Sequence, residues 1–194
     1  IFADECYSEI YRYAPPPGLM QVSEKLGADP NRVVTFHSLS KRSNLPGLRS
    51  GFAASGEKNI KQMKQLKAYS GAPIPEPLQH VSASVWSDEE HVVKNRKIYE
   101  KKYKIADQIF DDFDGYFSPE AGFFLWINVG DGEKVALELW QNCGVRVLPG
   151  RYLAKDFNGQ SPGDQFIRVA MVSELEETKR GLSKIREFLR EKQV

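Results

Sequence analysis

The chain contains 194 residues, with 27 Lys and Arg against 26 Asp and Glu, which gives a formal net charge of +1. A charge this close to zero creates no overall field for nucleic acid or an anionic membrane, and no apolar run is long enough to cross a bilayer. Two cysteines, Cys6 and Cys143, are too few for a disulfide framework, and no Cys/His spacing suits a metal, so we expect a reducing, cytoplasmic setting.

In the first half of the chain, short apolar runs alternate with segments of helical periodicity. Strands are predicted at residues 1–3, 33–37 and 51–54, and helices at 19–26, 57–69 and 78–86. In the helix at 57–69, we expect Ile60, Met63 and Leu66 to face inward, while four lysines follow another, solvated side. Because the chain opens without Met inside a predicted strand, we expect it to be a C-terminal fragment of a longer protein.

A long helix is predicted to follow Ser87, which has the spacing of a capping box with Glu90. Since such a helix often joins two domains, we expect domains at residues 1–87 and 88–194. Further strands are predicted at 123–129, 145–148 and 166–172, with helices at 133–142 and after Ser173, and this alternation indicates an α/β or α+β fold. The two long helices carry buried stripes, formed by Val92, Tyr99, Tyr103, Ala106, Ile109 and Phe113 in the first and by Leu175, Thr178, Leu182, Ile185 and Leu189 in the second.

The turn between the second and third strands carries the strongest chemical pattern. Lys41 stands at the end of the strand, and an amine in a partly desolvated site can become a nucleophile. Ser38, Ser40 and Arg49 could clamp one phosphate, with two hydroxyls donating and a guanidinium binding bidentately. This combination points to chemistry on a phosphorylated cofactor. The alternative is a polar surface turn whose Arg49 is ion-paired elsewhere.

Three further residues could complete such a site. Asp4 ends a buried strand, where a carboxylate is costly without a cationic partner, and a protonated pyridine nitrogen would be one. Tyr7, three residues later, could reach the same ring. Arg168 lies in the middle of an apolar strand and needs a carboxylate, from the protein or from a substrate. The alternative is a strand-ending Asp4 and a packed Tyr7.

These motifs resemble the class I/II aminotransferases, which are fold-type I pyridoxal-phosphate enzymes. The resemblance covers the chain through Asp4-Glu5-Cys6-Tyr7, Ser38-Leu39-Ser40-Lys41, Arg49, Leu148-Pro149-Gly150 and Ile167-Arg168-Val169-Ala170. More narrowly, residues 40–52, 87–92 and 147–154 are similar to succinyldiaminopimelate aminotransferases, which serve lysine biosynthesis in bacteria.

The resemblance implies the C-terminal part of the pyridoxal-phosphate-dependent transferase fold: the end of the large, mostly parallel sheet domain and the whole small α/β domain. Lys41 would hold pyridoxal 5'-phosphate as a Schiff base and then move a proton. Asp4 would pair with the pyridine nitrogen, and Tyr7 would contact the phenolic oxygen. Ser38, Ser40 and Arg49 would bind the phosphate, and Arg168 would bind the substrate carboxylate.

The implied reaction moves an amino group between N-succinyl-L,L-diaminopimelate, or a similar amino acid, and the 2-oxo acid 2-oxoglutarate, in a homodimer. The family's glycine-rich turn, ring-stacking aromatic and asparagine have no counterpart here. We therefore expect them upstream of Ile1 and expect the fragment alone to be inactive. Alternatives are a transaminase or C–S lyase for another amino acid, and a non-catalytic pyridoxal-phosphate-binding module.

Overall fold

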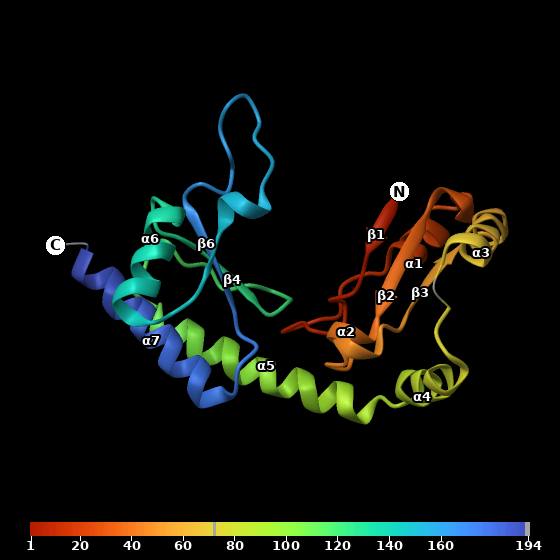
Figure 1. Cartoon of the computed structure of the whole chain (residues 1–194), viewed down its shortest axis with the longest axis horizontal. Coiled ribbons are helices and arrows are strands. Elements are labelled where there is room, and N and C mark those ends of the chain that lie inside the picture. The colour runs from red at the N-terminus through yellow and green to blue at the C-terminus, as the bar shows by residue number, and fades with distance from the viewer. Residues whose placement is uncertain (72, 193–194) are drawn as a thin grey trace. The chain divides into compact units, whose positions relative to one another are not determined.

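The computed structural model describes residues 1–71 and 73–192, which form two compact units at 1–96 and 97–194 (Figure 1). The division falls inside the long helix α5 (Glu90–Ile109). The first turns of α5 belong to unit 1, where the Arg96 guanidinium bonds the Glu9 carboxylate at 2.7 Å and stacks on the ring of Tyr11. The domain boundary expected near Ser87 stays a prediction, since the division into compact units does not test it.

Unit 1 is built on a three-stranded sheet in the order β1-β2-β3. Strand β1 (Phe2–Asp4) runs parallel to β2 (Val34–Ser38), and β3 (Gly51–Ser55) is antiparallel to β2. The register places Asp4 opposite Phe36, so the carboxyl ends of β1 and β2 meet at one end of the sheet. The other elements are α1 (Leu19–Lys25), η1 (Pro30–Arg32), α2 (Leu39–Arg42), η2 (Pro46–Leu48), α3 (Glu57–Ser70) and α4 (Glu76–Ser87).

Unit 2 holds a second sheet in the order β4-β6-β5, with antiparallel pairing throughout. Its strands are β4 (Phe124–Asn128), β5 (Leu148–Pro149) and β6 (Phe166–Ala170). One face is fully buried, because Leu125, Ile127 and Ile167 alternate with half-exposed neighbours as a pleated strand requires. The helical elements are α6 (Gly132–Glu138), η3 (Leu139–Cys143), η4 (Gly150–Leu153) and α7 (Leu175–Lys192).

The structure corrects four local expectations. Strand β1, expected to be buried, exposes Phe2 (81%) and Asp4 within unit 1. Ser87 does not cap α5: it is the last residue of α4 and donates to the Ala83 carbonyl, while Asp88 accepts from the Glu90 N–H at 2.8 Å. Helix α3 buries none of its residues, and Leu66, expected inward, is 67% exposed. The predicted strand at 145–148 is reduced to Leu148–Pro149.

Both predicted buried stripes are largely confirmed. In α5, Val92, Tyr99, Tyr103 and Ala106 are buried, whereas Ile109 is not. Phe110 and Phe113, just beyond the end of the helix, are buried as well. In α7, Thr178, Leu182, Ile185 and Leu189 are buried, and Leu175 at the first turn is only half-buried. Across residues 1–71 and 73–192, no helix is both long enough and apolar enough to cross a membrane.

Candidate functional site

Lys41 sits in α2, the single turn that directly follows β2. Ser38 caps this turn, because its hydroxyl accepts the Ser40 N–H at 3.1 Å. Leu39 is fully buried, and its N–H donates to the Ser50 carbonyl at 3.1 Å. The buried side chain and the cap together hold the backbone around Lys41 in one place.

Two hydroxyls and a guanidinium lie on the loop around this turn. The Ser38 and Ser40 hydroxyl oxygens are 2.9 Å apart, and Ser38 pairs with Gly51 across the sheet. Arg49, two residues before Gly51, adopts a left-handed backbone with φ of 55° and donates to the Pro46 carbonyl at 2.8 Å. Within the described residues, Arg49 makes no ion pair with a carboxylate. Its charge is therefore available to an anion that approaches the loop.

Asp4 provides an ionised carboxylate at the same end of the sheet. Hydrogen bonds from the Cys6 thiol and from the Cys6 N–H, the latter at 3.1 Å, hold the pKa of Asp4 below its usual value, and His37 adds a smaller electrostatic effect. Burial, reinforced by Asp4, raises the pKa of the Cys6 thiol to about 11. Asp4 therefore carries its charge at neutral pH and Cys6 does not.

Tyr7 brings the loop after β1 to the amine of Lys41. The Lys41 Nζ lies 5.8 Å from the centroid of the Tyr7 ring, within the range of a cation–π contact. This contact joins the loop after β1 to the turn after β2. The structure thus gathers six predicted site residues within unit 1: Asp4, Tyr7, Ser38, Ser40, Lys41 and Arg49.

The seventh predicted residue, Arg168, belongs to unit 2. It is the one charged residue in strands β4, β5 and β6, and it stands opposite Trp126 on β4 and Leu148 on β5. Its guanidinium stacks over the Phe124 ring, 4.2 Å from the centroid. Arg168 forms no ion pair with any carboxylate in the described part of the chain, so its anionic partner is not supplied by unit 2.

Three residues beside the Lys41 turn were not predicted to belong to the site: Arg42, His37 and Glu5. Arg42 is buried and bonded to Glu89, and His37 pairs with Glu5 at 3.2 Å between Nε2 and Oε2. Glu5 also accepts the Leu19 N–H that begins α1. Arg42 and Glu5 resemble ordinary surface charges in the sequence, although Arg42 follows a candidate nucleophile directly. A cavity of about 230 Å³ adjoins these groups and is lined in part by Cys6, Ser38 and Arg42.

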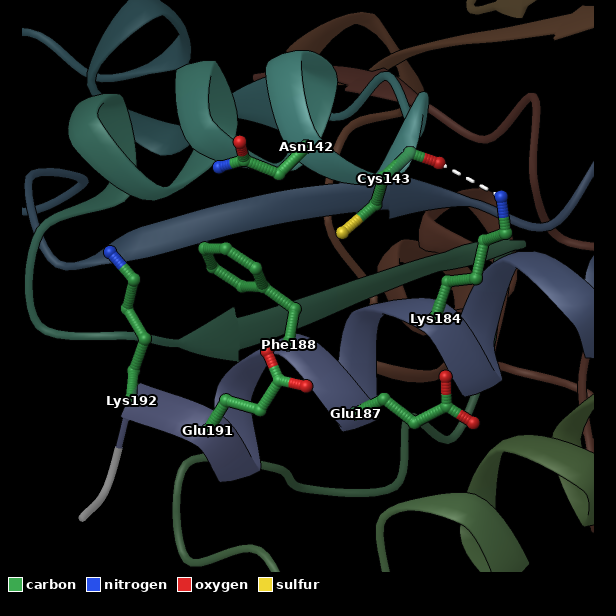
Figure 2. A pocket seen from close by; sticks show the side chains of 7 residues that line it. All are labelled: Asn142, Cys143, Lys184, Glu187, Phe188, Glu191 and Lys192. Carbon is green, nitrogen blue, oxygen red and sulfur yellow. Dashed lines mark hydrogen bonds between the residues drawn. The ribbon is translucent and has the colours of Figure 1, made fainter.

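Another groove lies in unit 2, and its lining includes none of the predicted site residues (Figure 2). It encloses about 570 Å³ between η3 and α7. Lys184 crosses one end and donates to the Cys143 carbonyl at 2.9 Å, while the Phe188 ring and the Cys143 side chain face each other across the groove. Both acidic side chains of the lining, Glu187 and Glu191, come from α7. The described residues contain no cluster of three His, Cys, Asp or Glu side chains that could hold a metal.

Comparison with known proteins identifies the family. The family model described as aminotransferase class I and II matches residues 1–185. The chain belongs to the class I and II aminotransferases. This family uses pyridoxal phosphate. The resemblance seen in the motifs around Lys41 and Arg168 is thereby confirmed at the family level.

Several relatives show how far the likeness extends. A crystal structure of an aminotransferase from Neisseria meningitidis Z2491 is 37% identical and aligns with 97% of this chain at a TM-score of 0.92. The 4-dedimethylamino-4-oxo-anhydrotetracycline transaminase OxyQ of Streptomyces rimosus is 29% identical over 88% of the chain. An LL-diaminopimelate aminotransferase of Dehalococcoides mccartyi is 25% identical over 80% of the chain.

The match covers only part of each relative. The chain spans 49% of the Neisseria meningitidis structure, 46% of OxyQ and 40% of the Dehalococcoides mccartyi enzyme. Within that part the predicted α/β fold is confirmed, because the structural alignment runs through both units of the chain.

Proposed function

We propose that the protein containing this chain is a pyridoxal-phosphate-dependent aminotransferase. The observation that carries the proposal is the set of side chains at the carboxyl ends of β1 and β2, where Lys41, Asp4 and Tyr7 share one end of the sheet with Ser38, Ser40 and Arg49. Membership of the class I and II family supports it.

The donor set suits a phosphorylated pyridine. Asp4 is ionised, as a carboxylate must be to hold a proton on a pyridine nitrogen. Ser38 and Ser40 offer neighbouring hydroxyls, and Arg49 has no carboxylate partner among the described residues, so a phosphate dianion would meet three donors. Tyr7 offers a phenolic side chain whose ring centroid lies 5.8 Å from the Lys41 amine. These are the groups that would hold the cofactor.

Each residue has a chemical task in the proposed reaction. Bound pyridoxal phosphate supplies an electron-withdrawing ring that stabilises negative charge beside an amino group. Lys41 Nζ would hold the cofactor covalently, and the same amine would carry a proton to and from the substrate Cα. Asp4 would keep the ring nitrogen protonated. Arg168 binds the substrate α-carboxylate through its planar fork of donors.

As the amino donor we propose N-succinyl-L,L-diaminopimelate, with 2-oxoglutarate as the acceptor, in a cytoplasmic homodimer of the lysine pathway. The motif at residues 40–52 supports this choice, and LL-diaminopimelate aminotransferases occur among the relatives at about 25% identity. A second candidate is a transaminase for a different amino donor. The similarity to OxyQ, which is named for a tetracycline intermediate, favours keeping that candidate.

The proposal is tested on the full-length protein. Pyridoxal phosphate should give a visible absorbance band that disappears in Lys41→Ala and persists in Lys61→Ala, which changes an exposed lysine of α3. A band of equal strength in Lys41→Ala contradicts the role of Lys41. A panel of amino donors, with and without the succinyl group, then separates the two candidate substrates.

Arg168→Lys tests the carboxylate site separately. Lysine cannot bind a carboxylate bidentately, so we expect KM for amino acids to rise about tenfold or more while the absorbance band remains. An unchanged KM would show that the α-carboxylate is bound elsewhere.

A further inference from the structure

The residue directly after Lys41 ties its turn to a distant part of unit 1. Arg42 is only 6% exposed. Its guanidinium donates to the carbonyls of Val85 at 3.2 Å and Trp86 at 3.4 Å, and it bonds the Glu89 carboxylate. It also lies over the Trp86 ring, 5.2 Å from the centroid. All of these partners belong to the end of α4 or to the junction that leads into α5.

A second connection leaves the same turn one residue later. The Ser43 hydroxyl and the His91 Nε2 are 2.8 Å apart, and the His91 Nδ1 lies 2.8 Å from the Asp88 carboxylate. The hydrogen bond with His91 lowers the pKa of Asp88, whose other oxygen accepts the Glu90 N–H at the start of α5. His91 is therefore held between the Lys41 turn and the cap of α5.

Both connections follow from elementary costs of burial. A buried guanidinium must be paired and hydrogen-bonded, and the last carbonyls of a helix lack partners within the helix. Arg42 satisfies both needs at once, and a positive charge at the end of α4 also complements the helix dipole. Moving α2 away from this junction would leave a buried charge without its partners and take from the Trp86 carbonyl the donor that Arg42 provides, while the Val85 carbonyl would keep only the Asp88 N–H at 3.3 Å. The turn is therefore held at both its cap and its end.

We infer that Arg42 and His91 are positioning residues for Lys41, acting through the backbone of α2 and the Ser43 hydroxyl. The inference rests on the proposed function, because it concerns where the Lys41 amine is held. Neither side chain needs to touch substrate or cofactor. Ser38 fixes the start of the turn, and Arg42 and His91 fix its end against the α4–α5 junction.

The test uses Arg42→Met and His91→Leu in the full-length protein, with His91→Gln as a conservative variant that keeps a hydrogen bond to Ser43. Arg186→Met is the matched control. Arg186 is also a buried arginine, 5% exposed, paired with the Asp112 carboxylate at 2.8 Å and stacked 5.1 Å from a phenylalanine ring, but in unit 2. Its loss should cost stability of a similar kind without touching the Lys41 turn.

Small displacements of a reacting group cost up to about a hundredfold in rate. We therefore expect Arg42→Met to lower kcat about tenfold to a hundredfold, and His91→Leu about threefold to tenfold, with KM changed less than about threefold. Both should shift the pH midpoint of the bound-cofactor absorbance, and His91→Gln should restore it. In cofactor-free protein, the amides of residues 39–43 should exchange faster in both variants and not in Arg186→Met.

The outcomes separate the two claims. If the unsubstituted protein gives no bound-cofactor absorbance, the proposed function fails and the inference falls with it. If the absorbance and activity are present, but Arg42→Met and His91→Leu match Arg186→Met in kcat and in pH midpoint, only the positioning inference is overturned. Because the His91 side chain is about a third exposed, His91→Leu is expected to fold even if Arg42→Met does not. Retained kcat and an unchanged midpoint in His91→Leu would then overturn the inference for this residue.

Discussion

Lys102 offers a direct test of how a buried charge stabilises unit 2. It lies on α5, is 4% exposed, and its ammonium donates to the Met171 carbonyl at 2.8 Å and the Ser173 carbonyl at 2.6 Å. These two carbonyls stand on the segment that joins β6 to α7. Burial lowers the pKa of Lys102 below its usual 10.5, opposed by the nearby Glu174. Replacement by Met keeps the aliphatic length and removes both hydrogen bonds.

The expected loss follows from the partners that remain. In Lys102→Met the Met171 carbonyl loses its donor, which costs roughly 1–3 kcal/mol for a buried acceptor. The Ser173 carbonyl still accepts from the Thr178 hydroxyl at 3.0 Å, so its loss is smaller, about 0.5–1 kcal/mol. Lys102→Met also removes the desolvation cost of the buried ammonium, which offsets part of this loss of stability. We expect a net destabilisation of about 2 kcal/mol, or a fall in Tm of about 10 °C for a unit of roughly 100 residues.

The pH dependence carries a definite sign. A lysine whose pKa is lower in the folded state destabilises the fold while it is charged, and this penalty disappears as the pH rises from the folded pKa towards 10.5. The unsubstituted protein should therefore gain stability relative to Lys102→Met as the pH is raised through that window.

Denaturant unfolding at several pH values measures both effects. Lys104→Met, at an exposed position of the same helix, is the control and should stay within about 0.5 kcal/mol of the parent protein. If Lys102→Met is as stable as the unsubstituted protein, the desolvation cost of the ammonium is as large as the stabilisation from its hydrogen bonds. If the difference in unfolding free energy between the unsubstituted protein and Lys102→Met shrinks as the pH rises, the lowered pKa of Lys102 is contradicted.

Further substitutions test other parts of the structure. Gly132→Ala should destabilise unit 2 by more than about 2 kcal/mol, because a Cβ there would lie 2.1 Å from the Phe166 carbonyl oxygen of β6. Gly181→Ala, which places its methyl group in open space on α7, should instead stabilise unit 2 by about 0.5–1 kcal/mol. Thermal unfolding of both variants measures the two effects, and equal changes in Tm would refute the close approach at Gly132. Leu39→Ala removes the fully buried side chain beside the Lys41 turn and should cost about 2–5 kcal/mol in denaturant unfolding, so a cost under about 1 kcal/mol would show that the turn is anchored elsewhere. With a pKa of about 11, only about one Cys6 thiol in a thousand is ionised at pH 8, so iodoacetamide followed by peptide mapping should find Cys143 alkylated well before Cys6. The reverse order would contradict the raised pKa of Cys6.

Much of the proposed site is local in the sequence, which is why it could be predicted. Ser38, Ser40 and Lys41 lie within four residues, and Arg49 is on the loop that returns to the sheet, so chain connectivity alone keeps these groups near one another. Asp4 joins them because parallel strands bring their carboxyl ends to one edge. The individual roles of these residues stay predictions.

Other features depend on how distant segments of the chain pack together. Arg42 looks like a surface charge in the sequence, and its burial depends on where the end of α4 packs. Ser87 has the spacing of a helix cap, yet α4 extends through it and Asp88 takes that place. In the same way, Leu66 follows a helical period, yet it is 67% exposed and α3 buries none of its residues.

The family, the alternation of strands and helices, and the buried stripes of α5 and α7 could be predicted from the order of amino acids, since each depends on residue types at fixed spacing. Which charges are buried and what pairs with them could not, because burial and pairing depend on elements far apart in the chain. The turn around Lys41 shows both. Its residues are evident from the order of amino acids, whereas its attachment to the α4–α5 junction through Arg42 and His91 exists only in the folded chain.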